Sequence, residues 1–140
     1  MRKPFALPLL LLALCACDAN QPQQPATLAT IAKDVYEPYR PEDYPRIFLM
    51  LEGEAEPAAR IQRAREAYAK RVAAYPTCHQ VETVDISTDS STRAELQVFA
   101  YCSNATHRMR FRAGELALLQ PGEARPDLYC PLSGGPCERI

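Results

Sequence analysis

The sequence predicts an α+β fold in which one main helix packs on a small antiparallel meander of three or four strands, stabilised by disulfides. Three observations lead to this fold class. Apolar residues recur every three to four positions between Pro57 and Tyr75, which is the period of an amphipathic helix. After Pro76 the period changes to two, which is the period of a strand. Cysteines recur through the second half of a chain whose 140 residues suffice for one small domain.

Composition excludes some functional classes. The chain has 16 basic and 17 acidic side chains, which is a formal net charge of −1 at pH 7. Binding of nucleic acid through bulk positive charge is therefore excluded. A hydrophobic fraction of 47% is ordinary for a globular protein and argues against disorder of the whole chain.

The first residues have the organisation of a secretory signal. Arg2 and Lys3 provide a positive start, and Phe5 to Leu14 is an apolar run that is interrupted by Pro8. Ten residues of helix reach about 15 Å, which is half of a hydrocarbon core of about 30 Å. We therefore expect residues 1–16 to be a cleaved signal peptide and not a membrane-spanning helix.

The end of this leader, Leu14-Cys15-Ala16-Cys17, resembles the lipobox of bacterial lipoproteins. The resemblance implies that signal peptidase II cuts before Cys17 and that acyl chains are attached to this cysteine. Cys17 is favoured over Cys15 because Ala16 is a small preceding residue, whereas Cys15 follows the bulky Leu14. Stable anchoring takes two lipid signals, which three acyl chains exceed. The alternative is an ordinary secreted protein that is cut elsewhere.

The resemblance also implies a location in a bacterial cell envelope, with the lipid-anchored chain facing the periplasm. Asp18 directly follows Cys17, and in enteric bacteria this arrangement resembles the signal that keeps lipoproteins in the inner membrane. The inner membrane is therefore favoured. Arg2 and Lys3 are lost with the leader, so the number of basic side chains falls from 16 to 14. With 17 acidic side chains, the expected net charge of the mature protein is −3.

Residues 17–45 are expected to hold the lipidated cysteine and a Pro-rich tether. Prolines stiffen a chain toward polyproline II and prevent a regular helix. The prolines of this segment are Pro22, Pro25, Pro38, Pro41 and Pro45. Leu28 to Val35 could form a short helical turn within it. The segment is interpreted as a spacer, with recruitment of a ligand as the alternative, and the folded domain is expected to span residues 46–140.

Two helices are expected at the start of this domain. Ile47 to Leu51 is the densest apolar run, with Pro45 suited to the first turn of a short helix and Gly53 to its end. The longer helix begins at Pro57 and ends near Tyr75. Its apolar stripe consists of Ile61, Ala64, Tyr68, Val72 and Tyr75. We expect this stripe to pack against the sheet and the arginine-rich remainder to face water.

The first long strand is expected at Val81 to Ser87. Val81 and Val84 have opposite parity in an alternating strand. Both can face the core only if the strand contains a bulge or reaches an early edge. The residues that follow, Thr88 to Thr92, have the composition of a turn.

Two alternating strands are expected at Glu95 to Cys102 and at Thr106 to Ala113. In each strand, every second residue is mainly apolar and would form one face of the strand. In the second strand, the residues between them are mainly arginines, which would form the opposite face. Leu116 to Leu119 is a candidate fourth strand. The tail from Gln120 has no periodicity, and we expect a disulfide to hold it in shape.

Four cysteines remain in the mature domain, and an even number outside the cytoplasm favours two disulfides. If the first two strands pair antiparallel, Gln80 faces Cys102, and Cys78 lies two residues beyond Gln80. This register favours a bond between Cys78 and Cys102. Cys130 and Cys137 would then close a small loop. Three connectivities are possible, and this one is favoured.

Metal binding and catalysis are the alternatives to a purely structural use of these residues. Cys78, His79, Cys102 and His107 could meet near one sheet edge, and such sets bind zinc. The adjacent Cys78 and His79 lack the usual ligand spacing, so we expect no metal or other cofactor. We find no Gly-rich phosphate loop and no nucleophile elbow. An enzyme or zinc-dependent binder that uses His79 and His107 remains the alternative.

The most suggestive surface is the row Arg108, Arg110 and Arg112. At period two these side chains stand on one strand face, about 6.8 Å apart. Acidic residues on neighbouring strands could neutralise the row, namely Glu82, Asp85 and Glu95. Otherwise the row suits an acidic protein or an anionic envelope polymer, since guanidinium groups bind carboxylate and phosphate in a forked geometry.

The sequence thus predicts a membrane-anchored envelope lipoprotein that acts as a non-catalytic protein-interaction module. Such a module would be an accessory subunit of an envelope machine, or an inhibitor or immunity-type protein. Its expected partners are the membrane, through the lipid anchor, and an envelope protein or anionic envelope polymer. Nucleic acid is not expected among them.

Overall fold

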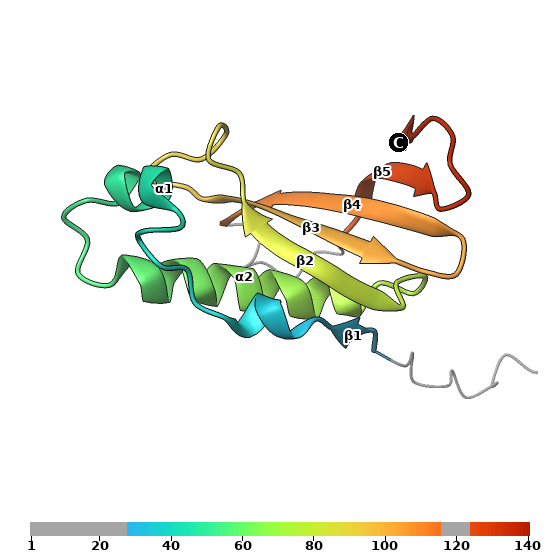
Figure 1. The fold of residues 1–140 in the computed structure, drawn as a ribbon, viewed down its shortest axis with the longest axis horizontal. Helices are drawn as coiled ribbons and strands as arrows, with labels where there is room; N and C mark the ends of the chain where they lie inside the picture. Colours follow the sequence, from blue (N-terminus) through green and yellow to red (C-terminus); the bar gives the residue numbers. More distant parts are fainter. Residues whose placement is uncertain (1–27, 116–123) are drawn as a thin grey trace, which may run out of the picture.

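A computed structural model describes residues 28–115 and 124–140 (Figure 1). The elements, in chain order, are β1 (Thr30–Ile31), the 3-10 helix η1 (Lys33–Tyr36), α1 (Pro45–Met50), α2 (Pro57–Ala73), β2 (Gln80–Ile86), β3 (Gln97–Ser103), β4 (His107–Gly114), β5 (Pro126–Pro131) and β6 (Glu138–Arg139). The expected signal peptide, the lipobox with Cys17, and the candidate strand Leu116 to Leu119 lie outside the described residues.

The strands form one mixed sheet of six, in the order β1-β2-β3-β4-β5-β6. β1 runs parallel to β2, and each later pair of neighbours is antiparallel. The expected antiparallel meander of three or four strands is therefore wrong. β1 and β6 have two residues each, and β5 begins and ends with proline. Strands this short, or with proline at both ends, show no detectable alternation of apolar and polar residues in the sequence.

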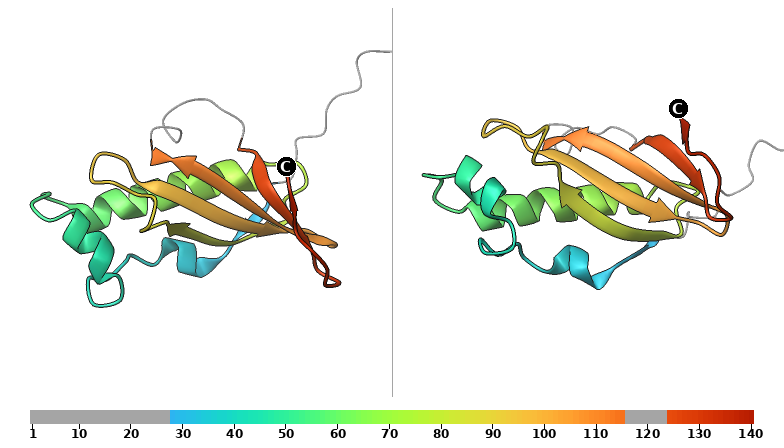
Figure 2. Two further views of the ribbon diagram at one scale, coloured as in Figure 1. Left: turned by 90° about the horizontal axis from the view of Figure 1, so that it is seen from above. Right: turned by 45° about the horizontal axis from the view of Figure 1, so that its top comes forward.

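α2 packs along one face of the sheet (Figure 2). Four of the five stripe residues are buried in the helix, and Tyr75 lies beyond its end and is half-buried. Pro57 occupies the first turn, where its missing N–H costs nothing. The sheet contributes much of the remaining core, including Val81, Val84, Ile86, Val98, Ala100, Cys102, Met109 and Phe111.

β2 contains the irregularity that the parity of its valines predicts. Its register with β3 shifts between Val81 and Thr83, and as a result both Val81 and Val84 are buried. The expected register is wrong by one residue, because Gln80 lies opposite Ser103. Val81 and Cys102 instead pair on the core face, which buries both side chains.

Residues 28–45 pack on the domain, although the sequence assigns them to the tether. β1 pairs with the start of β2, and Val35 and Tyr39 are buried in the core. A helical turn was expected at Leu28 to Val35; β1 occupies the first part of this range, and the 3-10 helix η1 begins in its last part, at Lys33. The folded part therefore begins before residue 46. Single buried side chains, and not a periodic apolar stripe, attach this segment to the domain. Its sequence pattern therefore does not indicate that the segment is buried.

Arg65 fixes this N-terminal segment to α2 and to β2. Arg65 is buried, with only 5% of its surface exposed. Nε donates to the carbonyl of Val84 at 2.9 Å, Nη1 to that of Glu37 at 2.7 Å, and Nη2 to that of Asp34 at 3.2 Å. The guanidinium carbon lies 4.4 Å from the centre of the Tyr39 ring. Burial lowers the pKa of Arg65 through desolvation, and these contacts compensate for much of that cost.

The outer edge of β2 needs such partners because β1 covers only its first residues. An uncovered edge leaves backbone donors and acceptors unpaired and invites other strands. Here the carbonyl of Val84 accepts from Arg65, and the backbone N–H of Ile86 donates to the Tyr39 hydroxyl at 3.3 Å. Side chains thus take the place of a neighbouring strand.

A second arginine ties the start of α2 to the sheet. Arg60 donates from Nε and Nη2 to the two carboxylate oxygens of Glu115, at 3.0 and 2.6 Å. Its Nη1 donates to Glu54 and to the carbonyl of Arg93. Glu115 also accepts from the backbone N–H of Leu96 at 3.2 Å, and the hydrogen bond with Arg60 is the main cause that lowers the pKa of Glu115. The cluster joins α2, the β2–β3 loop and the end of β4.

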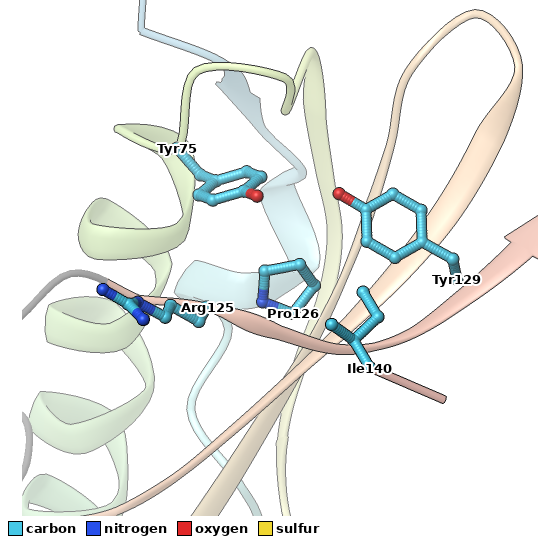
Figure 3. Close-up of a pocket in the computed structure, with 5 residues that line it drawn as sticks. All are labelled: Tyr75, Arg125, Pro126, Tyr129 and Ile140. Atoms are coloured by element: carbon cyan, nitrogen blue, oxygen red, sulfur yellow. The ribbon is translucent and has the colours of Figure 1, made fainter. Parts of the chain in front are cut away.

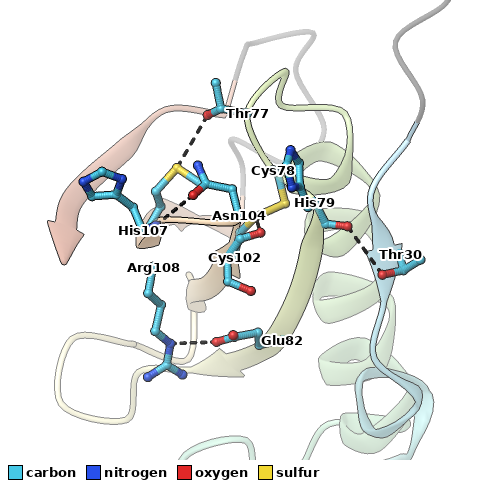
Figure 4. Close-up of a disulfide and its surroundings, with 11 residues drawn as sticks. Thr30, Thr77, Cys78, His79, Glu82, Cys102, Asn104, His107 and Arg108 are labelled. Carbon is cyan, nitrogen blue, oxygen red and sulfur yellow. Dashed lines mark hydrogen bonds and ion pairs between the residues drawn. A yellow bond between two sulfur atoms is a disulfide. The ribbon is translucent and has the colours of Figure 1, made fainter. Parts of the chain in front are cut away.

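The disulfides join Cys78 with Cys102 and Cys130 with Cys137, which are the pairs expected from the sequence. The first is buried and links the segment between α2 and β2 to β3 (Figure 4). The second links the end of β5 to the residue before β6 and closes the loop 131–136. Both lie toward the same end of the sheet.

Replacing Arg65 by Met should lower the free energy of unfolding by about 3 kcal/mol, because the buried carbonyl of Val84 and the partly buried carbonyls of Glu37 and Asp34 lose their donors. Denaturant unfolding followed by circular dichroism measures this change. Arg63→Met is the matched control, since its side chain on the same helix is 69% exposed and the change should cost little. Equal stability of the two variants would contradict the role of Arg65.

Candidate functional site

The arginines that the sequence singled out lie on β4, on the parity that points away from the buried side chains. α2 covers the other face of the sheet (Figure 2). Along β3 and β4, every second side chain is buried on the α2 side of the sheet, and the side chains between them point away from α2. The side chains turned away include Phe99, Tyr101, Arg108, Arg110 and Arg112. The register places Phe99 opposite Arg112 and Tyr101 opposite Arg110. We call this surface the open face.

Phe99 and Tyr101 form the centre of the open face. Their rings meet edge to face, with centroids 5.9 Å apart and planes at 82°. The guanidinium of Arg108 lies 4.2 Å from the centre of the Tyr101 ring. Both aromatic residues are half-buried by neighbouring side chains of the sheet. Aromatic residues beside arginine are typical of the centre of a protein interface.

The three arginines differ in how firmly acidic residues hold them. Arg108 Nε lies 2.7 Å from Glu82 Oε2, and Arg110 binds both oxygens of Asp127 at 3.0 and 2.8 Å. The hydrogen bond to Asp127 is the main cause that raises the pKa of Arg110. Arg112 only approaches Asp127, at 4.0 Å, and its side chain is 55% exposed. Arg112 therefore keeps the most capacity for an external anion.

Asp127, the main neutralising residue, was not predicted from the sequence. Asp127 lies on β5, whose lack of alternation hid the strand, so nothing placed this carboxylate beside β4. Of the three acids expected to answer the arginines, only Glu82 has an ion pair with one of them among the described residues. Glu95 accepts from a glutamine side chain on β3, and Asp85 accepts from the next backbone N–H.

Asp85 lies at the β2 edge of the open face, in the wall of a cavity of about 530 Å³. Other walls are the stacked rings of Tyr39 and Tyr44, 3.6 Å apart, and the buried Arg65. Desolvation raises the pKa of Asp85, and the hydrogen bond from the backbone N–H of Ile86 opposes part of this rise. A carboxyl group with a shifted pKa in a cavity is a candidate binding group.

A second cavity, of about 600 Å³, lies between the end of α2 and β5 (Figure 3). Its walls are Tyr75, Arg125, Pro126, Tyr129 and Ile140. The two tyrosine hydroxyls point toward each other, and their hydrogen bond is the main cause that raises the pKa of Tyr75. These walls supply aromatic, apolar and guanidinium groups, which suit binding of a ligand.

The structure places His79 just before β2 and His107 at the start of β4, at one end of the sheet with β3 between these strands (Figure 4). His79 is exposed just before β2, and its backbone carbonyl accepts from Thr30. His107 Nδ1 hydrogen bonds with the Thr106 hydroxyl at 2.8 Å, and its ring meets the edge of Tyr129. Each histidine thus has local structural partners.

Binding of a metal by Cys78, His79, Cys102 and His107 would need two free thiolates, but both cysteines are in a disulfide. Cys78 and Cys102 are bonded to each other, so neither sulfur is a thiolate ligand in this form. Over residues 28–115 and 124–140, no group of three or more His, Cys, Asp or Glu side chains lies close enough to hold a metal ion.

Comparison of the chain with protein-family models, with curated proteins and with solved structures found no match. No helix in the part of the chain that the structure describes is long and apolar enough to cross a membrane. The candidate site is therefore defined by geometry, as an aromatic centre with one partly available arginine on the open face.

Replacing Asp85 by Asn should raise the melting temperature at pH 7, because the amide has no charge to desolvate. The folded-state pKa of Asp85 lies above its unfolded value, so the carboxyl destabilises the fold only where it is ionised. The difference between variant and wild type should disappear as the pH falls below about 4. Thermal melts between pH 7 and pH 3 measure it, and a lower melting temperature of the variant at pH 7 would contradict the prediction.

Proposed function

We propose that the chain is a membrane-anchored envelope lipoprotein whose domain is a non-catalytic protein-interaction module. The open face carries the interaction role, because its aromatic pair stands beside arginines on a sheet face that α2 leaves uncovered. An aromatic centre with a charged rim has the composition of a protein interface. The module would serve as an accessory subunit of an envelope machine, or as an inhibitor or immunity-type protein.

The anchor is supported by the lipobox, which makes Cys17 the proposed site of lipidation. The disulfides Cys78–Cys102 and Cys130–Cys137 support an oxidising compartment, which fits a chain that faces the periplasm. Asp18 favours retention in the inner membrane. Together these features describe a domain that is exported, oxidised and held at a membrane by its N-terminal end.

A protein is the partner that suits the open face best. It would offer an apolar side chain to Phe99 and Tyr101 and a carboxylate to Arg112. Arg108 and Arg110 already have acidic partners, so they would orient the contact and exclude water. An anionic polymer is less well matched, because it would need several arginines free at once.

Replacing Cys17 by Ser should move the protein from the membrane fraction to the soluble fraction, because the thiol that takes the lipid is gone. Fractionation together with palmitate labelling measures location and lipid on the same sample. Cys15→Ser is the matched control and should stay labelled and anchored. A Cys17→Ser protein that remains in the membrane would refute the proposed anchor.

Replacing Arg112 by Glu should weaken capture of the partner about tenfold, because it sets a like charge against the expected carboxylate. A crosslinking pull-down from native membranes measures capture. The melting temperature should hold, since Arg112 has no close ion pair, whereas reversal of Arg110 would break its bonds to Asp127.

The control for this experiment is Lys70→Glu, the same reversal of charge at an exposed position of α2, on the side of the sheet away from the open face. It should leave capture unchanged. Equal capture by the Arg112→Glu and Lys70→Glu proteins would remove the open face as the binding surface.

A further inference from the structure

The described loops and strand ends that meet at one end of the sheet contain no ionic side chain, and the Arg108–Glu82 ion pair lies next to them. Hydrogen bonds join these parts: Thr30 N–H to the carbonyl of His79, His79 N–H to that of Ser103, and Leu132 N–H to that of Thr106. The segments that meet there are 28–32, 76–80, 103–107 and 131–137. None of them contains Asp, Glu, Lys or Arg, although these residues make up 24% of the chain. We call this surface the uncharged end.

The opposite end of the domain is rich in charge. It holds α1, the turn between α1 and α2, and the loop between β2 and β3, and Figure 1 shows α1 and β1 far apart along the longest axis. Arg46 of α1 and Asp89 of the loop form an ion pair at 3.3 Å. The charged residues of this end include Arg46, Glu52, Glu54, Glu56, Asp89, Arg93 and Glu95.

The uncharged end also exposes leucine. Leu28 is 66% exposed and Leu132 is 55% exposed. Around them lie hydroxyl, amide and imidazole groups, several of which are visible in Figure 4. A surface of leucines and neutral polar groups can lie in the headgroup region of a bilayer without desolvating a full charge, which is the costly step for Asp, Glu, Lys or Arg.

The expected anchor is attached to the chain at this same end. The backbone N–H of Ala29 donates to the carbonyl of Ala73, so Leu28 lies beside the end of α2. Cys17 precedes Leu28 by 11 residues, which span at most about 40 Å when fully extended. Lipid on Cys17 would therefore attach the domain to the bilayer through the uncharged end.

We propose that the uncharged end is the lipid-facing surface of the domain and rests on the headgroup region of the membrane that holds the anchor. This inference rests on the proposed lipidation of Cys17. The strands then run away from the bilayer, and α1 is the part farthest from it. The open face stands upright on the membrane, where a partner in the same envelope reaches it from the side.

A single tryptophan tests this orientation, because the chain contains none. Full-length lipidated Leu132→Trp and Leu49→Trp proteins are placed in vesicles of phosphatidylethanolamine and phosphatidylglycerol with brominated acyl chains, which quench tryptophan on contact. Leu49 is 71% exposed on α1, so it is the matched control at the charged end. We expect the Leu132→Trp signal to fall by about half, as for a side chain at the boundary of headgroups and acyl chains, and the Leu49→Trp signal to hold.

The second probe of the same surface is Leu28→Trp, which should be quenched like Leu132→Trp. Adding Leu132→Asp to the Leu28→Trp protein should reduce that quenching, because it brings a charge to the uncharged end. Circular dichroism confirms that each variant is folded before its signal is compared.

Several outcomes would overturn the orientation. These are equal quenching of Leu132→Trp and Leu49→Trp, quenching of Leu49→Trp alone, or no quenching of proteins that float with the vesicles. Absence of quenching together with a dimer in sedimentation would assign the uncharged end to a second copy of the chain. Proteins that fail to float with the vesicles refute the anchor on Cys17 itself, and the orientation falls with it.

Discussion

The buried guanidinium of Arg65 is the interaction on which the rest of the domain depends. It belongs to α2, but its partners are the carbonyl of Val84 in the sheet and those of Asp34 and Glu37 in the N-terminal segment. Gln62, on the preceding turn of α2, accepts from Arg65 at 2.9 Å and belongs to the same network. Burying a cation is costly, so the arrangement is stable only while these oxygens stay in place. One side chain thus fixes helix, sheet and segment relative to one another.

This constraint also shapes the surfaces that remain for function. Arg65 and Tyr39 satisfy groups on the β2 edge that would otherwise attract another strand. α2 covers one face of the sheet, and the opposite face keeps its aromatic centre and its arginines available. Within that face Glu82 and Asp127 restrain two of the arginines, so recognition concentrates on Phe99, Tyr101 and Arg112.

Charge is distributed along the molecule in a way that suits a chain tethered at one end. The ionic clusters of Arg60 and Arg46 lie far from the segment that leads to the proposed anchor. The Cys78–Cys102 bond lies beneath the uncharged end and keeps its strands together without using charge. In the proposed orientation this neutral surface rests on the bilayer and the open face stands upright, where it would meet a partner in the plane of the membrane.

The sequence by itself determined α2, β3, β4 and the bulge in β2, and it favoured the observed cysteine pairs among three possible connectivities. These depend on periodicity or register within one segment or between two adjacent strands. It also singled out the arginine row. Only the tertiary structure decided that β1, β5 and β6 complete a mixed sheet, that Asp127 neutralises Arg110, and that Arg65 is buried. Each of these results comes from contacts between residues far apart in the chain, where short strands and single buried side chains leave no periodic trace.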